Sequence, residues 1–231
     1  MKSKTLILLL AIIVCSCSNS VEYSETFKQE TSGKYLFNQD DVIKVYYENN
    51  TLLLKWREGL MTPVALDTNE FFVADMYKKL HFVQHPETKA RYLSIMSEGD
   101  DAIITYDYLK VPNDYKTPSM YLKEKNYEKA LAGFLLIKEK DSTSDFIHER
   151  DFNNLGYKAI SDKQYKDAIE IFKINVALHA TSDNVYDSLA EAYLLNGDSL
   201  NAHINFKKTL ELNFGNKRAQ NYIKAFENKK E

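Results

Sequence analysis

The chain has 231 residues, of which 44% are hydrophobic and 27% are charged, and its formal net charge is −3. This balance supplies enough apolar surface for one or two small domains and excludes global disorder. A slightly acidic chain gives no electrostatic reason to expect a nucleic-acid partner. Seven glycines and four prolines beside 16 tyrosines and 12 phenylalanines favour helix pairs and half-buried strands.

Residues 1–16 have the pattern of a signal peptide. Lys2 and Lys4 precede an apolar run, residues 5–14, that is too short to span a bilayer. A serine then precedes Cys17, which resembles the lipobox of bacterial lipoproteins. The resemblance implies cleavage before Cys17, acylation of its thiol and attachment to a membrane. We therefore expect a lipoprotein of the cell envelope, in the outer membrane and facing the periplasm or the surface. An ordinary secretory signal cut elsewhere is the alternative.

Residues 17–30 are polar and are interpreted as a tether, and residues 31–112 show the period of two that is typical of strands. Asn49-Asn50 lies between two alternating runs, 43–48 and 52–56, and predicts a hairpin because Asn tolerates positive φ. Further strands are predicted at 63–66, 70–74, 78–84, 91–96 and 102–109. The pattern predicts a small antiparallel β-sandwich or barrel-like domain.

After residue 112 the hydrophobic period becomes helical, and a repeat emerges. Phe152, Ala168 and Phe172 recur 34 residues later as Tyr186, Ala202 and Phe206. Leu155 and Gly156 correspond in the same way to Leu189 and Ala190. Small residues at these positions let two helices approach closely, while the aromatic rings fill the gap between neighbouring pairs. The pattern resembles the tetratricopeptide repeat (TPR).

The resemblance implies an α-helical, TPR-like solenoid over residues 113–231, so the fold class is α+β. A degenerate repeat is expected at about 114–140, fuller repeats at 149–181 and 183–215, and a capping helix at 216–229. Leu155, Phe172, Leu189 and Phe206 are expected to lie in the shared core.

In the TPR family, the first helix of each pair lines a concave face that holds extended or helical peptides. First-helix residues off the packing face are therefore candidates for a peptide-binding groove: Arg150, Asn153, Asn154, Tyr157, Asn184, Asp187, Ser188 and Glu191. Their amides, acids, tyrosine and one cation suit hydrogen bonding to a peptide backbone. We expect a protein or peptide partner. A structural repeat whose polar face is only solvated is the alternative.

Ser182-Asp183-Asn184 also occurs in the active sites of penicillin-recognising serine hydrolases. The chain has no Ser-x-x-Lys and no Gly-x-Ser-x-Gly, so the tripeptide is interpreted as a helix start. A β-domain beginning with Gly-Lys-Tyr-Leu-Phe, followed by helical repeats, looks like the tail of some bacterial β-lactamase-related serine hydrolases. No catalytic domain accompanies it, so we expect no catalytic residue; an orphan tail of such a hydrolase is a remaining alternative.

Neither a metal nor a cofactor is expected, because the five histidines lack the spacing of metal ligands. They are His81, His85, His148, His179 and His203. Aromatic residues of the strand region are either core or the lining of a small-molecule site: Tyr46, Tyr47, Trp56, Phe71, Phe72, Tyr92, Tyr106 and Tyr108. The expected function is protein–protein interaction by a non-enzymatic envelope lipoprotein. The alternative is an accessory ligand-binding lipoprotein of a nutrient-uptake or polysaccharide-degradation system.

Overall fold

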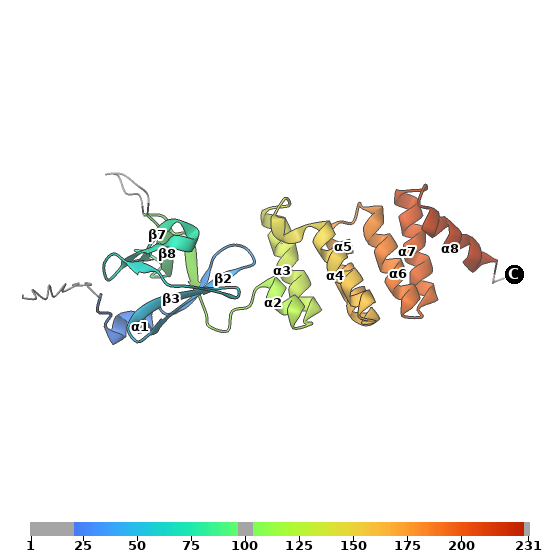
Figure 1. The fold of residues 1–231 in the computed structure, drawn as a ribbon. Coiled ribbons are helices and arrows are strands. Elements are labelled where there is room, and N and C mark those ends of the chain that lie inside the picture. Colours follow the sequence, from blue (N-terminus) through green and yellow to red (C-terminus); the bar gives the residue numbers. More distant parts are fainter. Residues whose placement is uncertain (1–20, 97–103, 229–231) are drawn as a thin grey trace, which may run out of the picture. The chain divides into compact units, whose positions relative to one another are not determined.

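The computed structural model describes residues 21–96 and 104–228, and the chain divides into two compact units (Figure 1). The strand unit contains the residues up to Ser32 and Val45–Asp107, and the helical unit contains Gly33–Lys44 and Tyr108–Glu231. Residue 112 is therefore not the single boundary between the units, because Gly33–Lys44 belongs to the helical unit. The predicted signal peptide and Cys17 lie outside the described residues.

The strand unit begins with a helix where the sequence predicted a polar tether. In α1 (Glu25–Thr31), the Ser24 hydroxyl caps the helix by accepting a hydrogen bond from the Phe27 amide at 3.2 Å. Tyr23 is 6% exposed and stacks on Phe27, whose ring meets Phe82 edge to face. The tether prediction is wrong for this segment, because two aromatic rings four residues apart find an apolar surface to cover.

The predicted hairpin is confirmed. β2 (Val42–Glu48) and β3 (Thr51–Trp56) are neighbours, and Asn49 and Asn50 between them have φ of 46° and 63°. Positive φ at both central residues is the geometry that matches the twist of two paired strands. An additional strand, β4 (Gly59–Met61), pairs antiparallel with β3.

Four further strands of this unit pair antiparallel in chain order. They are β5 (Val64–Ala65), β6 (Glu70–Val73), β7 (Lys78–Gln84) and β8 (Arg91–Ile95), with a short 3₁₀ turn, η1 (Ala74–Met76), before β7. Phe71, Leu80 and Leu93 are 1% exposed or less and form part of the core. The antiparallel strands that the sequence predicted are therefore present and form a curled sheet (Figure 1).

The helical unit starts from one strand pair. β1 (Gly33–Leu36) runs antiparallel to β9 (Tyr108–Val111), with Lys34 opposite Val111. β9 begins six residues later than the predicted strand at 102–109. Only Tyr108 and Leu109 of that prediction lie in a described strand.

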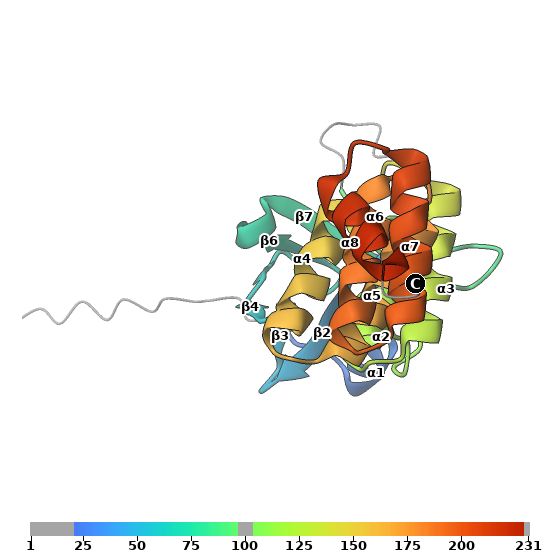
Figure 2. The same cartoon turned by 90° about the vertical axis from the view of Figure 1, so that its right-hand side faces the viewer.

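The helices of this unit form consecutive pairs. They are α2 (Pro118–Lys123) and α3 (Tyr127–Lys140), then η2 (Asp145–Ile147), α4 (Glu149–Ser161) with α5 (Tyr165–Leu178), α6 (Asp183–Leu195) with α7 (Ser199–Leu212), and α8 (Lys217–Glu227). They follow one another in a row in Figure 1, and Figure 2 views this row from the end at α8. Helices α2 and α3 lie within residues 114–140, α4 and α5 within 149–181, α6 and α7 within 183–215, and α8 within 216–229.

Close approach at Gly156 sets the packing of α4 on α5. A β-carbon added at Gly156 would come 2.3 Å from Cε1 of Phe172, whose ring is fully buried. Phe206, 34 residues further on, is 1% exposed and lies 4.6 Å from the ring of Tyr222 on α8. Small residues facing aromatic rings are the features that made the sequence resemble the TPR family, and the helical unit is TPR-like in this respect.

Leu155 is a correction to the predicted core. Its side chain is 44% exposed, whereas Leu189, its counterpart in the next repeat, is 4% exposed. The buried face of α4 runs through Phe152, Gly156 and Ala159, so Leu155 points to the side of the helix. The first helix before it, α2, has only six residues against 13 in α4, and leaves that side open.

We expect Gly156→Ala to lower the free energy of unfolding by about 1–3 kcal/mol, because the added methyl group must displace the Phe172 ring from a filled core. Urea unfolding followed by circular dichroism measures the change. Gly215→Ala is the control, since Gly215 is exposed and its added β-carbon would meet only the Asn213 side chain at 3.2 Å. Equal stability of Gly156→Ala and the wild type would contradict the close approach.

Candidate functional site

Ser182-Asp183-Asn184 forms the start of α6, as the sequence predicted. Ser182 is the N-cap residue, but no side-chain capping hydrogen bond is made. The other two side chains bond to different elements: Asp183 accepts from Asn213 at 3.0 Å, and Asn184 donates to Glu149 at 2.8 Å. The tripeptide therefore starts α6, as predicted, and its side chains tie this helix to its neighbours.

The eight predicted groove residues fall into two groups. Arg150, Asn154 and Asn184 are exposed. The remaining five, on α4 and α6, are partly or fully buried: Asn153, Tyr157, Asp187, Ser188 and Glu191. Three contacts join members of this second group. The Ser188 hydroxyl donates to Asn153 Oδ1 at 2.8 Å and lies 3.3 Å from the Tyr157 hydroxyl, which donates to Glu191 at 2.9 Å.

Arg218, on the capping helix α8, completes this cluster. Its Nε donates to Asp187 Oδ1 at 3.1 Å, and its two terminal nitrogens bond to Asp187 Oδ2 and to Glu191. One of them also donates to the Tyr157 hydroxyl at 3.3 Å. Asp187 is 6% exposed and Ser188 is fully buried. Two of the predicted groove residues on α6, Asp187 and Glu191, are therefore occupied by the chain's own arginine.

The sequence analysis missed Arg218, although its position carried a signal. It lies 34 residues after Asn184 and 68 after Arg150, so it occupies the same place in the helix repeat as two predicted groove residues. Burial lowers the pKa of the guanidinium, but the hydrogen bonds that it donates to Asp187 and Tyr157 raise the pKa by more. The cation is therefore retained at every physiological pH, opposite two carboxylates.

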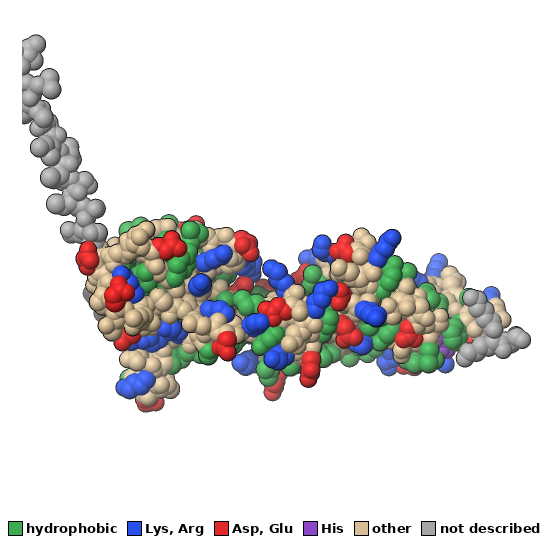
Figure 3. Space-filling view, turned by 90° about the horizontal axis from the view of Figure 1, so that it is seen from below, with side chains coloured by type: hydrophobic (Ala, Val, Ile, Leu, Met, Phe, Trp, Pro, Cys, Tyr) green, Lys and Arg blue, Asp and Glu red, His purple; other side chains and the backbone are tan. Residues whose placement is uncertain are grey.

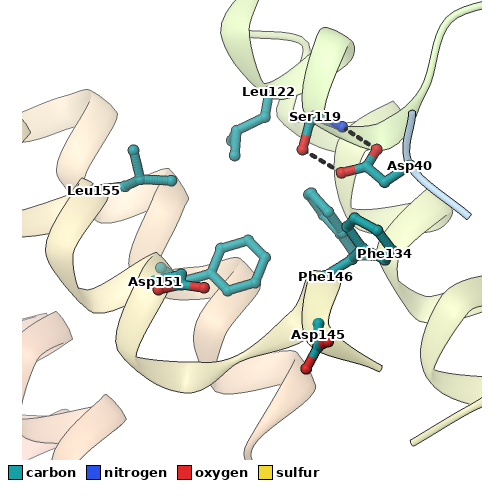
Figure 4. Close-up of a pocket in the computed structure, with 9 residues that line it drawn as sticks. Asp40, Ser119, Leu122, Phe134, Asp145, Phe146, Asp151 and Leu155 are labelled. Atoms are coloured by element: carbon teal, nitrogen blue, oxygen red, sulfur yellow. Dashed lines mark hydrogen bonds between the residues drawn. The ribbon is translucent and has the colours of Figure 1, made fainter. Parts of the chain in front are cut away.

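An open cavity of about 180 Å³ lies at the other end of the helix row, among α2, α3, η2 and α4 (Figure 4). Its apolar lining comes from Leu122, Phe134, Phe146, Phe152 and Leu155. Phe134 and Phe152 are buried and meet edge to face with ring centroids 5.0 Å apart. The exposed side of Leu155 thus belongs to a cavity with an aromatic floor.

The polar lining of the cavity is acidic. It consists of Asp40, Asp145 and Asp151, with Ser119. Asp40 is 6% exposed and accepts hydrogen bonds from the Ser119 amide at 2.8 Å and from the Ser119 hydroxyl (Figure 4). Burial is the main reason that the pKa of Asp40 lies above its ordinary value of 3.8, and the bonds from Ser119 oppose it. No lysine or arginine is among the described residues that line this cavity.

Within residues 21–96 and 104–228, no group of three His, Cys, Asp or Glu side chains is arranged to hold a metal ion. Two of the five histidines have packing roles. The His179 ring is within hydrogen-bond distance of the Ile147 carbonyl oxygen, at 2.8 Å, and His203 stacks on Phe226 with centroids 4.3 Å apart. His148 lies 3.0 Å from Asp145 at the start of α4.

The aromatic residues of the strand region mostly form packing pairs. Phe71 and Tyr108 are buried. Tyr47 shares a 2.7 Å hydrogen bond with Thr31, and burial raises its pKa to about 12. The Tyr106 side chain is 38% exposed, and its ring contacts the rings of Tyr92 and His85. The structure thus gives Phe71 and Tyr108 a core role, which was one of the two roles expected.

No protein-family model matches the sequence, and no curated protein matches it. Among solved structures, the first TPR of Spaghetti (RPAP3) bound to an HSP90 peptide is 18% identical, covering 48% of this chain and 85% of that one, with a TM-score of 0.35. The crystal structure of MamA is 22% identical, covering 48% of this chain and 64% of that one, with a TM-score of 0.34. The secretion chaperone SycD of Yersinia enterocolitica, with a YopD peptide, is 22% identical over 49% of this chain and 89% of that one, with a TM-score of 0.35.

The described helices are all too short or too polar to cross a membrane. On the face shown in Figure 3, acidic and basic side chains alternate over the helical unit, with hydrophobic side chains exposed between them.

Arg218→Met should lower the free energy of unfolding by about 1–3 kcal/mol, because it leaves buried Asp187 without its charged partner. The lower half of this range is expected, since the Arg218 side chain is 43% exposed and water screens the pair. Urea unfolding of the variant measures the loss. Lys217→Met, at an exposed neighbour on the same helix, is the matched control. If both substitutions cost the same, the network does not stabilise the unit.

Proposed function

We propose that this chain is a non-enzymatic binding protein that holds a segment of another protein against α2, η2 and α4. The observation that carries the proposal is the cavity beside Leu155, where the exposed Leu155 and the half-buried Leu122 and Phe146 line a hollow with an aromatic floor. Burying a leucine side chain is worth about 1.5–3 kcal/mol, so a partner that covers this surface gains affinity directly. Two solved structures named above are described with bound peptides, which is a property of those proteins.

The end of the row at α6 is a weaker candidate for the same role. Asp187, Ser188 and Glu191 already use hydrogen bonds within the chain, and Arg218 is the partner of the two carboxylates. A peptide binding there must first displace a charged side chain from a nearly buried carboxylate, which is costly. The proposed contact surface is therefore the end of the predicted groove that lies nearer α2, with Asn154 and Arg150 exposed on the same helix as Leu155.

We propose further that the chain is a lipoprotein, anchored in the cell envelope through acylated Cys17. This rests on the amino-terminal sequence pattern, in which a serine precedes the cysteine at the end of a short apolar run. Several acyl chains, at about 0.8 kcal/mol for each buried CH₂ group, give stable attachment where one chain does not. A protein held at the outer membrane in this way acts on partners in the same envelope.

The contact surface is tested by replacing Leu155 with the photo-crosslinking residue p-benzoylphenylalanine in cells that produce the protein. A discrete protein adduct is expected at this position because a bound partner covers it. The same residue at position 207 is the control, since Lys207 is exposed on α7 and lies outside the cavity. Absence of an adduct at position 155, or the same adducts at both positions, would count against the proposal.

The anchor is tested by growing cells with an alkyne-labelled palmitate and measuring label on the purified protein. Cys17→Ser should abolish the label, because it removes the acylated thiol, whereas Cys15→Ser should leave it intact. Mass spectrometry of the amino-terminal peptide then identifies the modified residue. Label that survives Cys17→Ser refutes the assignment.

A further inference from the structure

The cavity beside Leu155 combines an apolar floor with carboxylates of one sign, and the two together restrict what fits. Leu122, Phe146 and Leu155 supply half-buried or exposed apolar surface from three different elements. Asp40, Asp145 and Asp151 supply the charge. An acidic partner segment would be repelled here, and a purely apolar one would leave the carboxylates without compensation.

Asp40 is the carboxylate with most to gain from a cation. Its hydrogen-bond donors, the amide and hydroxyl of Ser119 and the side chain of Thr117, are all neutral groups. A carboxylate has about four acceptor positions, so capacity for a further donor remains. A carboxylate that is nearly buried among neutral donors is stabilised when a positive group reaches it, because burial has removed most of its water.

The other two carboxylates are accessible at the edge of the cavity. The Asp145 side chain is 89% exposed and has His148 at 3.0 Å as a neighbour. Asp151 is exposed in the first turn of α4, where an acid also interacts favourably with the helix dipole. A side chain that enters the cavity therefore passes exposed carboxylates before it reaches the aromatic floor.

Arginine is the side chain whose chemistry matches both features. Its three methylene groups lie favourably along apolar surface while the charged end stays at a polar edge. Its planar guanidinium stacks on aromatic rings and bonds to a carboxylate through two nitrogens, which the point charge of lysine does not do. The chain uses the same pairing internally, where Arg218 binds Asp187 and Glu191 through three nitrogens.

We propose that this cavity receives an arginine side chain from the segment of the protein partner, with its stem on Leu122, Phe146 and Leu155 and its guanidinium at the carboxylates. The inference rests on the proposed function, since it names the side chain that the same surface recognises. It makes the partner segment basic, and it makes the recognition dependent on charge as well as on apolar contact.

The probe is N-acetyl-arginine-methylamide, titrated into the protein with labelled leucine methyl groups and followed by NMR. Saturable shifts are expected for the methyl signals of Leu122 and Leu155. The citrulline analogue, which has nearly the same shape without the charge, should bind at least about tenfold more weakly, or about 1.4 kcal/mol. The double variant Asp145→Asn, Asp151→Asn should lose a similar factor, and its spectrum reports whether it is folded.

Glu139→Gln is the matched control, because Glu139 is an exposed acid on α3 that does not line the cavity. It should bind the arginine probe as the wild type does. Equal affinity for the arginine and citrulline probes, shifts elsewhere than the cavity, or the same loss in Glu139→Gln would overturn the inference. An adduct at position 155 without arginine selectivity leaves the proposed function standing. Selective binding of the arginine probe without a crosslinked adduct would support arginine binding in the cavity and contradict the proposed protein partner.

Discussion

The close approach of two helices at Gly156 is the packing constraint on which the helical unit depends. No β-carbon fits there beside the ring of Phe172, so α4 and α5 lie as near as their backbones allow. A comparable approach occurs at Gly133, where a β-carbon would come 2.5 Å from Cγ of Pro118 and hold α2 against α3. These approaches set the positions of the first helices, and hence which side chains meet beside them.

The carboxylates at the two ends of the helix row have different hydrogen-bond partners. At α6, Asp187 and Glu191 share an arginine from α8, which partly compensates their charge within the chain. At α2 and α4, Asp40 meets only neutral donors and lies beside exposed apolar side chains. The same residue type is thus structural at one end and available to a partner at the other. The difference depends on whether a later helix supplies the counter-charge.

Much of the local structure was predictable, because it depends on residues close together in the chain. Asn49 and Asn50 both adopt positive φ, as their position between two alternating runs indicated. The 34-residue repeat also relates Lys163 and Gly197, which follow the first helix of their pairs and both have positive φ. This correspondence was not predicted from the sequence. In contrast, the segment that forms α1 was predicted to be a polar tether. The aromatic rings of Tyr23 and Phe27 lie among polar residues, and Phe82, which Phe27 contacts, lies far along the chain.

By itself, the sequence determined the paired helices, their repeat and the hairpin, since apolar period and turn residues act over a few positions. Only the tertiary structure decided the candidate site. Asp40 reaches Ser119 across 79 residues of sequence, and Arg218 reaches Tyr157 across 61. Leu155 and Leu189 occupy equivalent repeat positions, yet one is open and the other buried. Which face of a helix is covered depends on the length and charge of its neighbours, and no local pattern carries that information.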